Sequence, residues 1–331
     1  MDSLITSNSE QYTNNELHEE GAPLKSQFAD LYKANTLKTL SQSQRRENQL
    51  QLLKERRHQS VDEKRNLTDL FHDFKENDHE EQMDVVIPCK TNSKMRYRHL
   101  KNKLMLSEWF SDIPNDLELN WLFKLCPSGV RNLVIAYRHK TMAFSIEGKR
   151  QAKFISHLPG GGPHSTFNKF TVLDCVYNVA QKCYYVLDVL AWNGFVLKNS
   201  NTELRFYWIK SKLDETPELK EATRGNPFTF VEVNFLPAEL PLLEEKLSQV
   251  HDDEQVSLDG IIFYHREVTY IENRTPLVGW LKPYMVPEML HIPVHPSFMK
   301  HKPRDYICLA HYLQEKHAKK KRPKSSEQME R

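Results

Sequence analysis

Between residue 104 and about residue 297, short runs of β-branched and aromatic residues follow one another with few long helical patterns between them. Such residues favour extended strands, and closely spaced strands favour antiparallel sheets in an α+β domain. The runs that we interpret as strands are 121–125, 133–137, 170–177, 183–190, 203–209, 258–264 and 275–285. The turn Pro127-Ser128-Gly129 joins the first two, which predicts a hairpin over 121–137. Residues 237–249 have the spacing of an amphipathic helix.

Length and charge leave the class of partner open. The 331 residues include 46 Lys and Arg and 44 Asp and Glu, a net charge of +2, so any nucleic-acid footprint has to be local. The five cysteines show no Cys-x-x-Cys spacing, which favours neither a disulfide framework nor a zinc site and fits a reduced cytosolic or nuclear compartment. No apolar run approaches the roughly 18 residues of a membrane span. We expect no metal, no cofactor and no membrane contact.

Composition divides the chain into five parts. Residues 1–22 are polar and aperiodic, as in a disordered tail, and residues 23–67 form a basic segment. Residues 68–100 read as an acidic linker, 101–300 as the globular domain and 301–331 as a basic disordered tail. The run at 319–324 is a solvated tail, a nuclear-localisation signal or a phosphate contact.

The basic segment predicts a helix. Ser41 and Gln44 have the spacing of a capping box, and good helix formers follow. The apolar stripe is thin, with Leu50 and Leu53 on one face, so we expect this helix to bury little against its own domain. Residues 25–65 hold ten Lys and Arg and five Asp and Glu. The segment is therefore either a solvated helix or one that folds on an acidic partner, with arginine forks against carboxylates.

Trp280 and Lys282 stand two residues apart in the strand predicted over 275–285. Side chains at this spacing share a face of a strand. A flat aromatic ring beside a cation suits a nucleobase and its phosphate. The alternative is a core tryptophan next to a surface lysine.

Four short stretches resemble, in sequence and order, the nucleotidyl-transfer motifs of messenger-RNA capping guanylyltransferases and ATP-dependent ligases. They are 126–131, 173–177, 258–263 and 277–283. Where those families have a lysine nucleophile, this chain has Cys126, and the glycine and glutamate of the second motif are replaced by Cys175 and Val176. A thiol does not form the stable phosphoramidate that an amine forms, and a metal without carboxylates loses its ligands. The resemblance implies a nucleotide pocket on a catalytically dead transferase scaffold.

Further stretches over about 23–290 are similar to snurportins, among them 104–110, 205–208, 226–228, 259–265 and 275–285. This resemblance implies a nuclear import adaptor that binds the 2,2,7-trimethylguanosine cap of spliceosomal small nuclear RNAs. It also implies recruitment of importin-beta by the basic segment, return by an exportin, and shuttling between cytoplasm and nucleus. By position, Trp280 would stack on the methylated guanine and Trp109 would lie beside its doubly methylated amine. The other implied pocket positions are Leu106, Ser107, Cys126, Arg131, Val176 and Lys282. The implied importin-beta-binding residues are Arg45, Arg46, Lys54, Arg56, Arg57, Lys64 and Arg65.

The chemistry of the cap agrees with these positions. A methylated guanine is cationic, so it stacks well on an indole, for about 1–3 kcal/mol per base. Its dimethylated amine calls for an apolar wall, such as Trp109 and Leu106, rather than a carboxylate. Ile146 stands where the family has a phosphate-contacting lysine, with Lys149 and Arg150 close behind it. Two other functions remain open: an active nucleotidyltransferase, and a protein-only import adaptor whose cap site has decayed.

Overall fold

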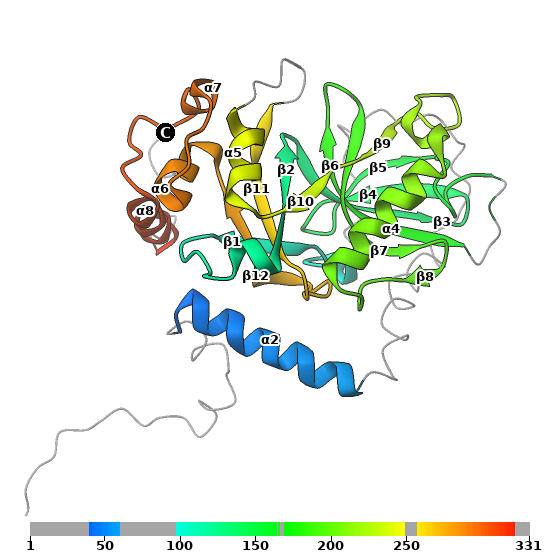
Figure 1. The fold of residues 1–331 in the computed structure, drawn as a ribbon. Helices are drawn as coiled ribbons and strands as arrows, with labels where there is room; N and C mark the ends of the chain where they lie inside the picture. Colours follow the sequence, from blue (N-terminus) through cyan, green and yellow to red (C-terminus); the bar gives the residue numbers. More distant parts are fainter. Residues whose placement is uncertain (1–39, 60–96, 164, 166–168, 249–256, 322–331) are drawn as a thin grey trace, which may run out of the picture. The chain divides into compact units, whose positions relative to one another are not determined.

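The computed structural model describes residues 40–59, 97–163, 165, 169–248 and 257–321 (Figure 1). The chain divides into two compact units, Met1–Leu40 and Ser41–Arg331, and every element described below belongs to the second. The predicted tail over 1–22 and most of the predicted acidic linker lie outside the described residues, as do Lys64 and Arg65.

A five-stranded sheet contains the first and the last strand of the globular domain. Its order is β1 (Met105–Trp109), β12 (Asn273–Leu281), β11 (Leu258–His265), β2 (Trp121–Pro127) and β10 (Phe235–Pro237). The pair β1–β12 is parallel, and the other neighbours in this sheet are antiparallel. Strand β1 lies at one edge of this sheet, next to β12.

A seven-stranded sheet forms the other half. Its order is β5 (Arg150–Phe154), β4 (Lys140–Phe144), β3 (Val130–Tyr137), β6 (Phe170–Asn178), β7 (Cys183–Trp192) and β8 (Phe195–Val196), and β9 (Thr229–Glu232) pairs in parallel with β7. The prediction of an α+β fold with mainly antiparallel sheets is confirmed.

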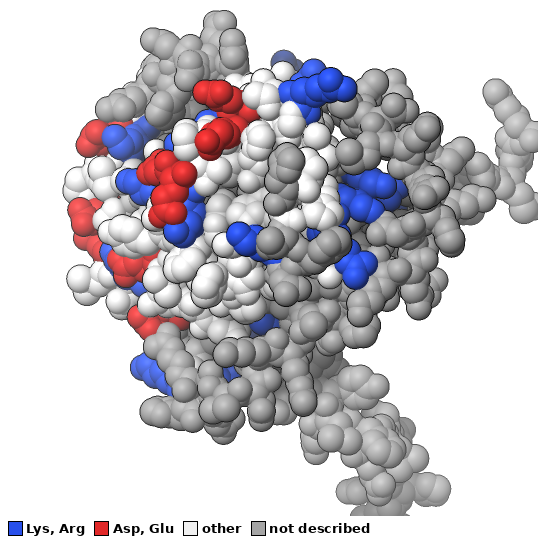
Figure 2. Space-filling model, turned by 90° about the vertical axis from the view of Figure 1, so that its right-hand side faces the viewer, with Lys and Arg blue, Asp and Glu red and all other residues white. Residues whose placement is uncertain are grey.

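Basic and acidic side chains both occur among the described residues on the face shown in Figure 2, so neither sign of charge dominates it.

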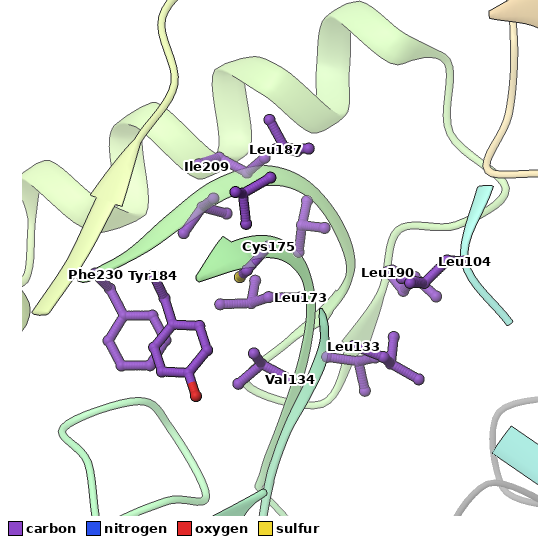
Figure 3. Close-up of a cluster of buried hydrophobic side chains, with 14 of the residues drawn as sticks. Leu104, Leu133, Val134, Leu173, Cys175, Tyr184, Leu187, Leu190, Ile209 and Phe230 are labelled. Carbon is purple, nitrogen blue, oxygen red and sulfur yellow. The ribbon is translucent and has the colours of Figure 1, made fainter. Parts of the chain in front are cut away.

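Helices cover the sheets and join their edges. They are α2 (Gln42–Gln59), α3 (Leu117–Asn120), α4 (Thr202–Asp214), α5 (Leu240–Ser248), α6 (Val286–Leu290), α7 (Pro296–Met299) and α8 (Leu309–Lys321). Short 3-10 turns occupy Arg98–Leu100, Pro217–Lys220 and Pro283–Met285. Figure 3 shows part of the main core, where Ile209 of α4 lies close to Leu187 of β7. Within the described residues, no helix has the length and apolarity needed to cross a membrane.

One predicted pairing and one predicted strand are wrong. Residues 121–137 do not form a hairpin, because β2 and β3 enter different sheets on either side of the turn after Pro127. Residues 203–209 belong to the helix α4. The Asn201 side chain accepts a hydrogen bond from the Leu204 amide and so caps this helix. Cap and burial together outweigh the β propensity of the aromatic residues in the segment.

A buried ion pair fixes α4 against β7. Arg205 Nε donates to Asp188 Oδ1 at 2.8 Å, and both side chains are 0% exposed. The other guanidinium hydrogens reach Asp188 Oδ2 and the carbonyls of Ser200 and Val268, so the buried charge is well satisfied.

The C-terminal segment also differs from its prediction. A disordered tail was expected from residue 301, but α8 forms there, and Leu309 and Tyr306 are buried in the second core cluster. Tyr306 donates a hydrogen bond to the carboxylate of Glu288 at 2.6 Å, which ties the segment to α6. Residues 322–331 lie outside the described part of the chain.

The capping box of α2 is confirmed. The Gln44 amide donates to Ser41 Oγ at 3.2 Å, and the Ser41 amide donates to Gln44 Oε1 at 3.1 Å. The helix nevertheless packs against its own domain, contrary to the expectation from its thin apolar stripe. Leu53 is 6% exposed in a cluster with Val268 and Leu277. Polar side chains make most of the remaining contact, which is why the apolar pattern did not reveal it.

Candidate functional site

Trp280 lies on β12 directly over the backbone of the neighbouring strand. A methyl group on Gly260 would lie 2.3 Å from Cζ2 of Trp280, so the ring occupies the space that a side chain would fill. The indole is partly exposed and packs against the main core cluster. Its environment is therefore intermediate between the two predicted alternatives, a core tryptophan and an open stacking surface.

Lys282 forms an ion pair with Asp259. Its Nζ donates to Asp259 Oδ1 at 2.5 Å and to the Asp259 carbonyl at 2.9 Å. The same nitrogen lies 5.6 Å from the centroid of the Trp280 ring. The predicted pair of aromatic and cation is present, and Asp259 balances the charge of the cation.

Arg131 is held by a network that sequence reasoning missed. Its Nε and Nη2 donate to the two carboxylate oxygens of Asp174 at 2.5 and 2.7 Å, and Nη2 also donates to the Met105 carbonyl at 3.2 Å. Tyr270 donates its hydroxyl hydrogen to Asp174 and accepts one from the Met105 amide. Although burial lowers the pKa of Arg131, the charge and hydrogen bonds of Asp174 raise it overall. The network joins β1, β3 and β6.

Cys126 and Val176 are both buried, 4% exposed each. Burial raises the pKa of the Cys126 thiol to about 12, so the group stays neutral near pH 7. A methyl group on Gly129 would lie 2.4 Å from the Tyr177 carbonyl oxygen and 2.6 Å from Cγ1 of Val176. The turn after β2 therefore lies tightly against β6, and the first two motifs are in contact.

The remaining predicted positions lie on β1 and near it. Leu106 is partly buried against the main core, and Ser107 is partly exposed. The register with β12 shifts between Ser107 and Glu108. Ile146 packs against the main core and brings no charge.

Trp109 is opposite Trp280 in the β1–β12 register but packs differently. Its ring belongs to the second core cluster and meets Tyr312 of α8 edge-on, with the centroids 5.3 Å apart. Lys316 Nζ lies 4.9 Å from the Trp109 centroid. The fold thus brings the two tryptophans to adjacent strands, while their side chains enter different clusters.

Lys124 is a further group that sequence reasoning did not single out. It lies two residues before Cys126 on β2 and is 1% exposed. Its Nζ donates to the Leu187 carbonyl at 2.7 Å and lies 3.6 Å from the Phe206 centroid. Burial lowers the pKa of this amine to about 7. The signal in the sequence was a lysine inside an otherwise apolar run, 121–126.

The described residues offer no cluster of three or more His, Cys, Asp or Glu side chains suited to a metal ion. The cysteines in the described ranges are free.

The basic residues of α2 fall into two groups. Arg45 pairs with Glu108, and Arg46 Nη2 lies 3.2 Å from Asp112 Oδ2. Lys54 and Arg56 are exposed. The side chain of Arg57 lies outside the described part of the structure. Gln42 also donates to the Trp109 carbonyl at 2.9 Å, so the start of α2 is fastened to β1.

Three solved ligase structures and one family model are similar to this chain. The ligase domain of LigD from M. tuberculosis is 15% identical, with a TM-score of 0.36, over 56% of this chain and 60% of that one. A Lig E DNA ligase is 14% identical, with a TM-score of 0.35, over 54% of this chain and 67% of that one. A mycobacterial DNA ligase D complexed with ATP is 14% identical, and the chain spans 61% of its length. The family model of the Snurportin1 m3G cap-binding domain matches residues 103–283, more than half of the 331 residues. The chain therefore belongs to the snurportin family and carries that family's m3G cap-binding domain.

Proposed function

We propose that this protein is a non-enzymatic nuclear import adaptor that binds the trimethylguanosine cap of small nuclear RNAs through Trp280. The observation that carries this proposal is the partly exposed indole held over Gly260, with the Nζ of Lys282 5.6 Å from the centroid of the ring. A cationic guanine gains from such a ring both by stacking and by cation–π attraction. Leu106 and Ser107 lie on β1, the strand next to β12, and Arg131 donates a hydrogen bond to the Met105 carbonyl of the same strand.

The chemistry of β2 supports a binding role rather than group transfer. The Cys126 thiol stays protonated near pH 7, so it is a poor nucleophile. Lys124 has an amine of lowered pKa, which is the property of a nucleophilic lysine. Its Nζ is enclosed between Phe206 and the Leu187 carbonyl, however, and so cannot reach a phosphate.

The test is retention on trimethylguanosine-cap resin. Trp280→Ala should bind about 5- to 150-fold more weakly, which corresponds to a loss of about 1–3 kcal/mol of stacking. The circular dichroism spectrum should not change. Trp208→Ala is the matched control, because Trp208 is another partly exposed tryptophan that packs against the main core, but from α4 rather than from β12. Equal binding by Trp280→Ala and wild type would place the cap elsewhere.

Incubation with radiolabelled GTP or ATP separates the enzymatic alternative from this proposal. A covalently labelled protein would mean that β2 carries out nucleotidyl transfer after all, and Lys124 would be the residue to examine first. A chain that binds importin-beta but shows no tryptophan quenching with a trimethylated cap dinucleotide would be a protein-only adaptor.

The adaptor role also requires importin-beta, which we assign to the basic segment around α2. The exposed Lys54 and Arg56 are available to an acidic partner, whereas Arg45 and Arg46 first have to leave Glu108 and Asp112. Return by an exportin and shuttling between nucleus and cytoplasm belong to the same proposal.

Replacing Arg45, Arg46, Arg56 and Arg57 by Glu should end the recovery of importin-beta in a pulldown, because a carboxylate repels the acidic partner. Undiminished recovery would remove the adaptor function while leaving cap binding untouched.

A further inference from the structure

We propose that the RNA beyond its cap has a binding surface of its own next to Trp280. This surface consists of a pocket at the end of β11 and β12 and of the basic loop 300–304 that follows α7. Its ligand would be the single-stranded segment directly after the capped nucleotide. The inference rests on the proposed function, since it says where the rest of the same ligand lies.

The pocket has a volume of about 260 Å³. Small-molecule sites usually measure about 300–1,000 Å³, so this pocket suits one planar group rather than a larger ligand. Polar and aromatic side chains line it together, namely Ser128, Ser257, Asp259, Lys282, Tyr284, Phe298 and His301. Aromatic rings among cations are what proteins use to hold single-stranded nucleic acid without reading its sequence.

Lys282 connects the pocket with the Trp280 ring. Its Nζ lies 5.6 Å from the centroid of that ring, and the same side chain lines the pocket. Ser128, on the turn after β2, also lines the pocket and shares a 2.7 Å hydrogen bond with Ser257. An RNA whose cap stacks on Trp280 therefore meets the pocket just beyond its capped nucleotide, outside the cap dinucleotide.

The loop supplies the positive charge that the pocket lacks. Within the pocket, Asp259 neutralises Lys282. The exposed cations of the loop are Lys300, Lys302 and Arg304. The acidic groups to set against these cations are Asp305, which directly follows the loop, and Glu288. Glu288 already accepts hydrogen bonds from the Tyr306 hydroxyl and the Leu309 amide. In the described parts of the chain no ion pair is formed by the three loop cations, so their charge is available to phosphates.

The position of the loop favours RNA over an acidic protein. Helices α6, α7 and α8 gather on one flank of the five-stranded sheet (Figure 1). Phe298 of α7 lines the pocket together with Lys282, whose Nζ lies 5.6 Å from the centroid of the Trp280 ring. With a net charge of only +2, the chain has no broad basic field, so a local patch beside the cap site is the footprint that a short RNA segment needs.

The test compares two probes on the full chain: the trimethylated cap dinucleotide, and the same cap on a single-stranded RNA of about ten nucleotides, within the usual site size. The variant Lys300→Gln, Lys302→Gln and Arg304→Gln should bind the capped RNA at least tenfold more weakly at 0.1 M salt. The slope of log affinity against log salt should fall by about 2, at about 0.7 per lost phosphate contact. The Kd for the dinucleotide should stay within twofold of wild type.

A second variant tests the pocket itself. His301 is exposed, so His301→Ala should fold normally, and it should weaken the capped RNA about fivefold or more without affecting the dinucleotide. The control replaces three exposed cations on the other half of the domain, Lys182, Lys210 and Arg224, with glutamine. This control should leave both affinities unchanged.

Each outcome decides between the two proposals. If wild type binds the dinucleotide and the loop variant binds capped RNA as well as wild type does, the loop surface is wrong and the cap site stands. If both probes weaken equally in the loop variant, the loop serves the cap itself and the extended surface is again refuted. If wild type binds neither probe, the cap-binding function fails, and this inference fails with it. A loop variant that loses only importin-beta would make the surface a protein contact.

Discussion

Gly260→Ala is the sharpest perturbation that this structure offers. The added methyl would lie 2.3 Å from Cζ2 of Trp280 and 2.7 Å from Cε2 and Cη2. Carbon atoms in contact normally keep about 3.5–4.0 Å apart, so the ring has to move by more than about 1 Å. The backbone of Gly260 does not adopt a positive φ, and an alanine therefore causes no backbone strain. Strand β11 is paired on both sides, so the indole is the part that yields.

Displacing the ring should cost most of the stacking energy. At about 1–3 kcal/mol per base, the Kd for a trimethylated cap dinucleotide should rise about 5- to 150-fold. Fluorescence titration gives this Kd, and thermal unfolding followed by circular dichroism reports whether the domain remains folded. Gly225→Ala is the matched control, since its methyl would lie 3.4 Å from His157, a contact that a side chain can absorb. A folded Gly260→Ala protein with the wild-type Kd would refute the claim that this face of Trp280 fixes the stacking position.

Three further predictions concern groups around the site. Burial lowers the pKa of Lys124 to about 7 from 10.5. Between these two pH values the unfolded chain binds more protons than the folded chain, so the free energy of unfolding rises with pH, by at most about 1.4 kcal/mol per pH unit. Lys124→Met should abolish this rise in urea titrations at pH 6.5 and pH 9, and parallel pH dependences of the two proteins would contradict it. Asp174→Asn leaves the Arg131 charge without its carboxylate and should lower the free energy of unfolding by about 3 kcal/mol. This is the lower end of the range for a broken buried ion pair, because Arg131 is partly exposed. A loss below about 1 kcal/mol in urea unfolding would count against that network. Glu108→Gln removes the carboxylate partner of Arg45 and should tighten importin-beta binding about 1.4- to fivefold, in line with about 0.2–1 kcal/mol for an ion pair near the surface. Weaker binding by calorimetry would argue against this contact as a restraint on Arg45.

Local sequence patterns predicted most of the strands around the site because the patterns report burial directly. The runs around Trp121, Phe170, Cys183 and Leu258 are strands, and the capping box at Ser41 begins a helix. The fold class followed from the same runs. Periodicity says which face of a strand is buried, but not which strand lies beside it, so it did not separate β2 and β3 into two sheets.

The unpredicted parts of the site depend on contacts between distant residues. Asp174 meets Arg131 across β3 and β6, and nothing near either residue indicates the other. Trp109 packs against Tyr312 of α8, and nothing near either residue in the sequence indicates the other. The contact of α2 with the domain is mostly polar, and an apolar pattern gives no measure of such contacts.

The parallel pairing of β1 with β12 sets an order of events during synthesis. The two strands join residue 105 to residue 273, and β1 has β12 as its neighbour in the sheet. Until the ribosome has released the residues up to Leu281, β1 lacks the strand with which it pairs, and the ring of Trp280 is not held over Gly260. Closing so long a loop is a late step of folding. A nascent or truncated chain therefore exposes an unpaired strand edge and holds no cap, so only a finished domain would compete for RNA.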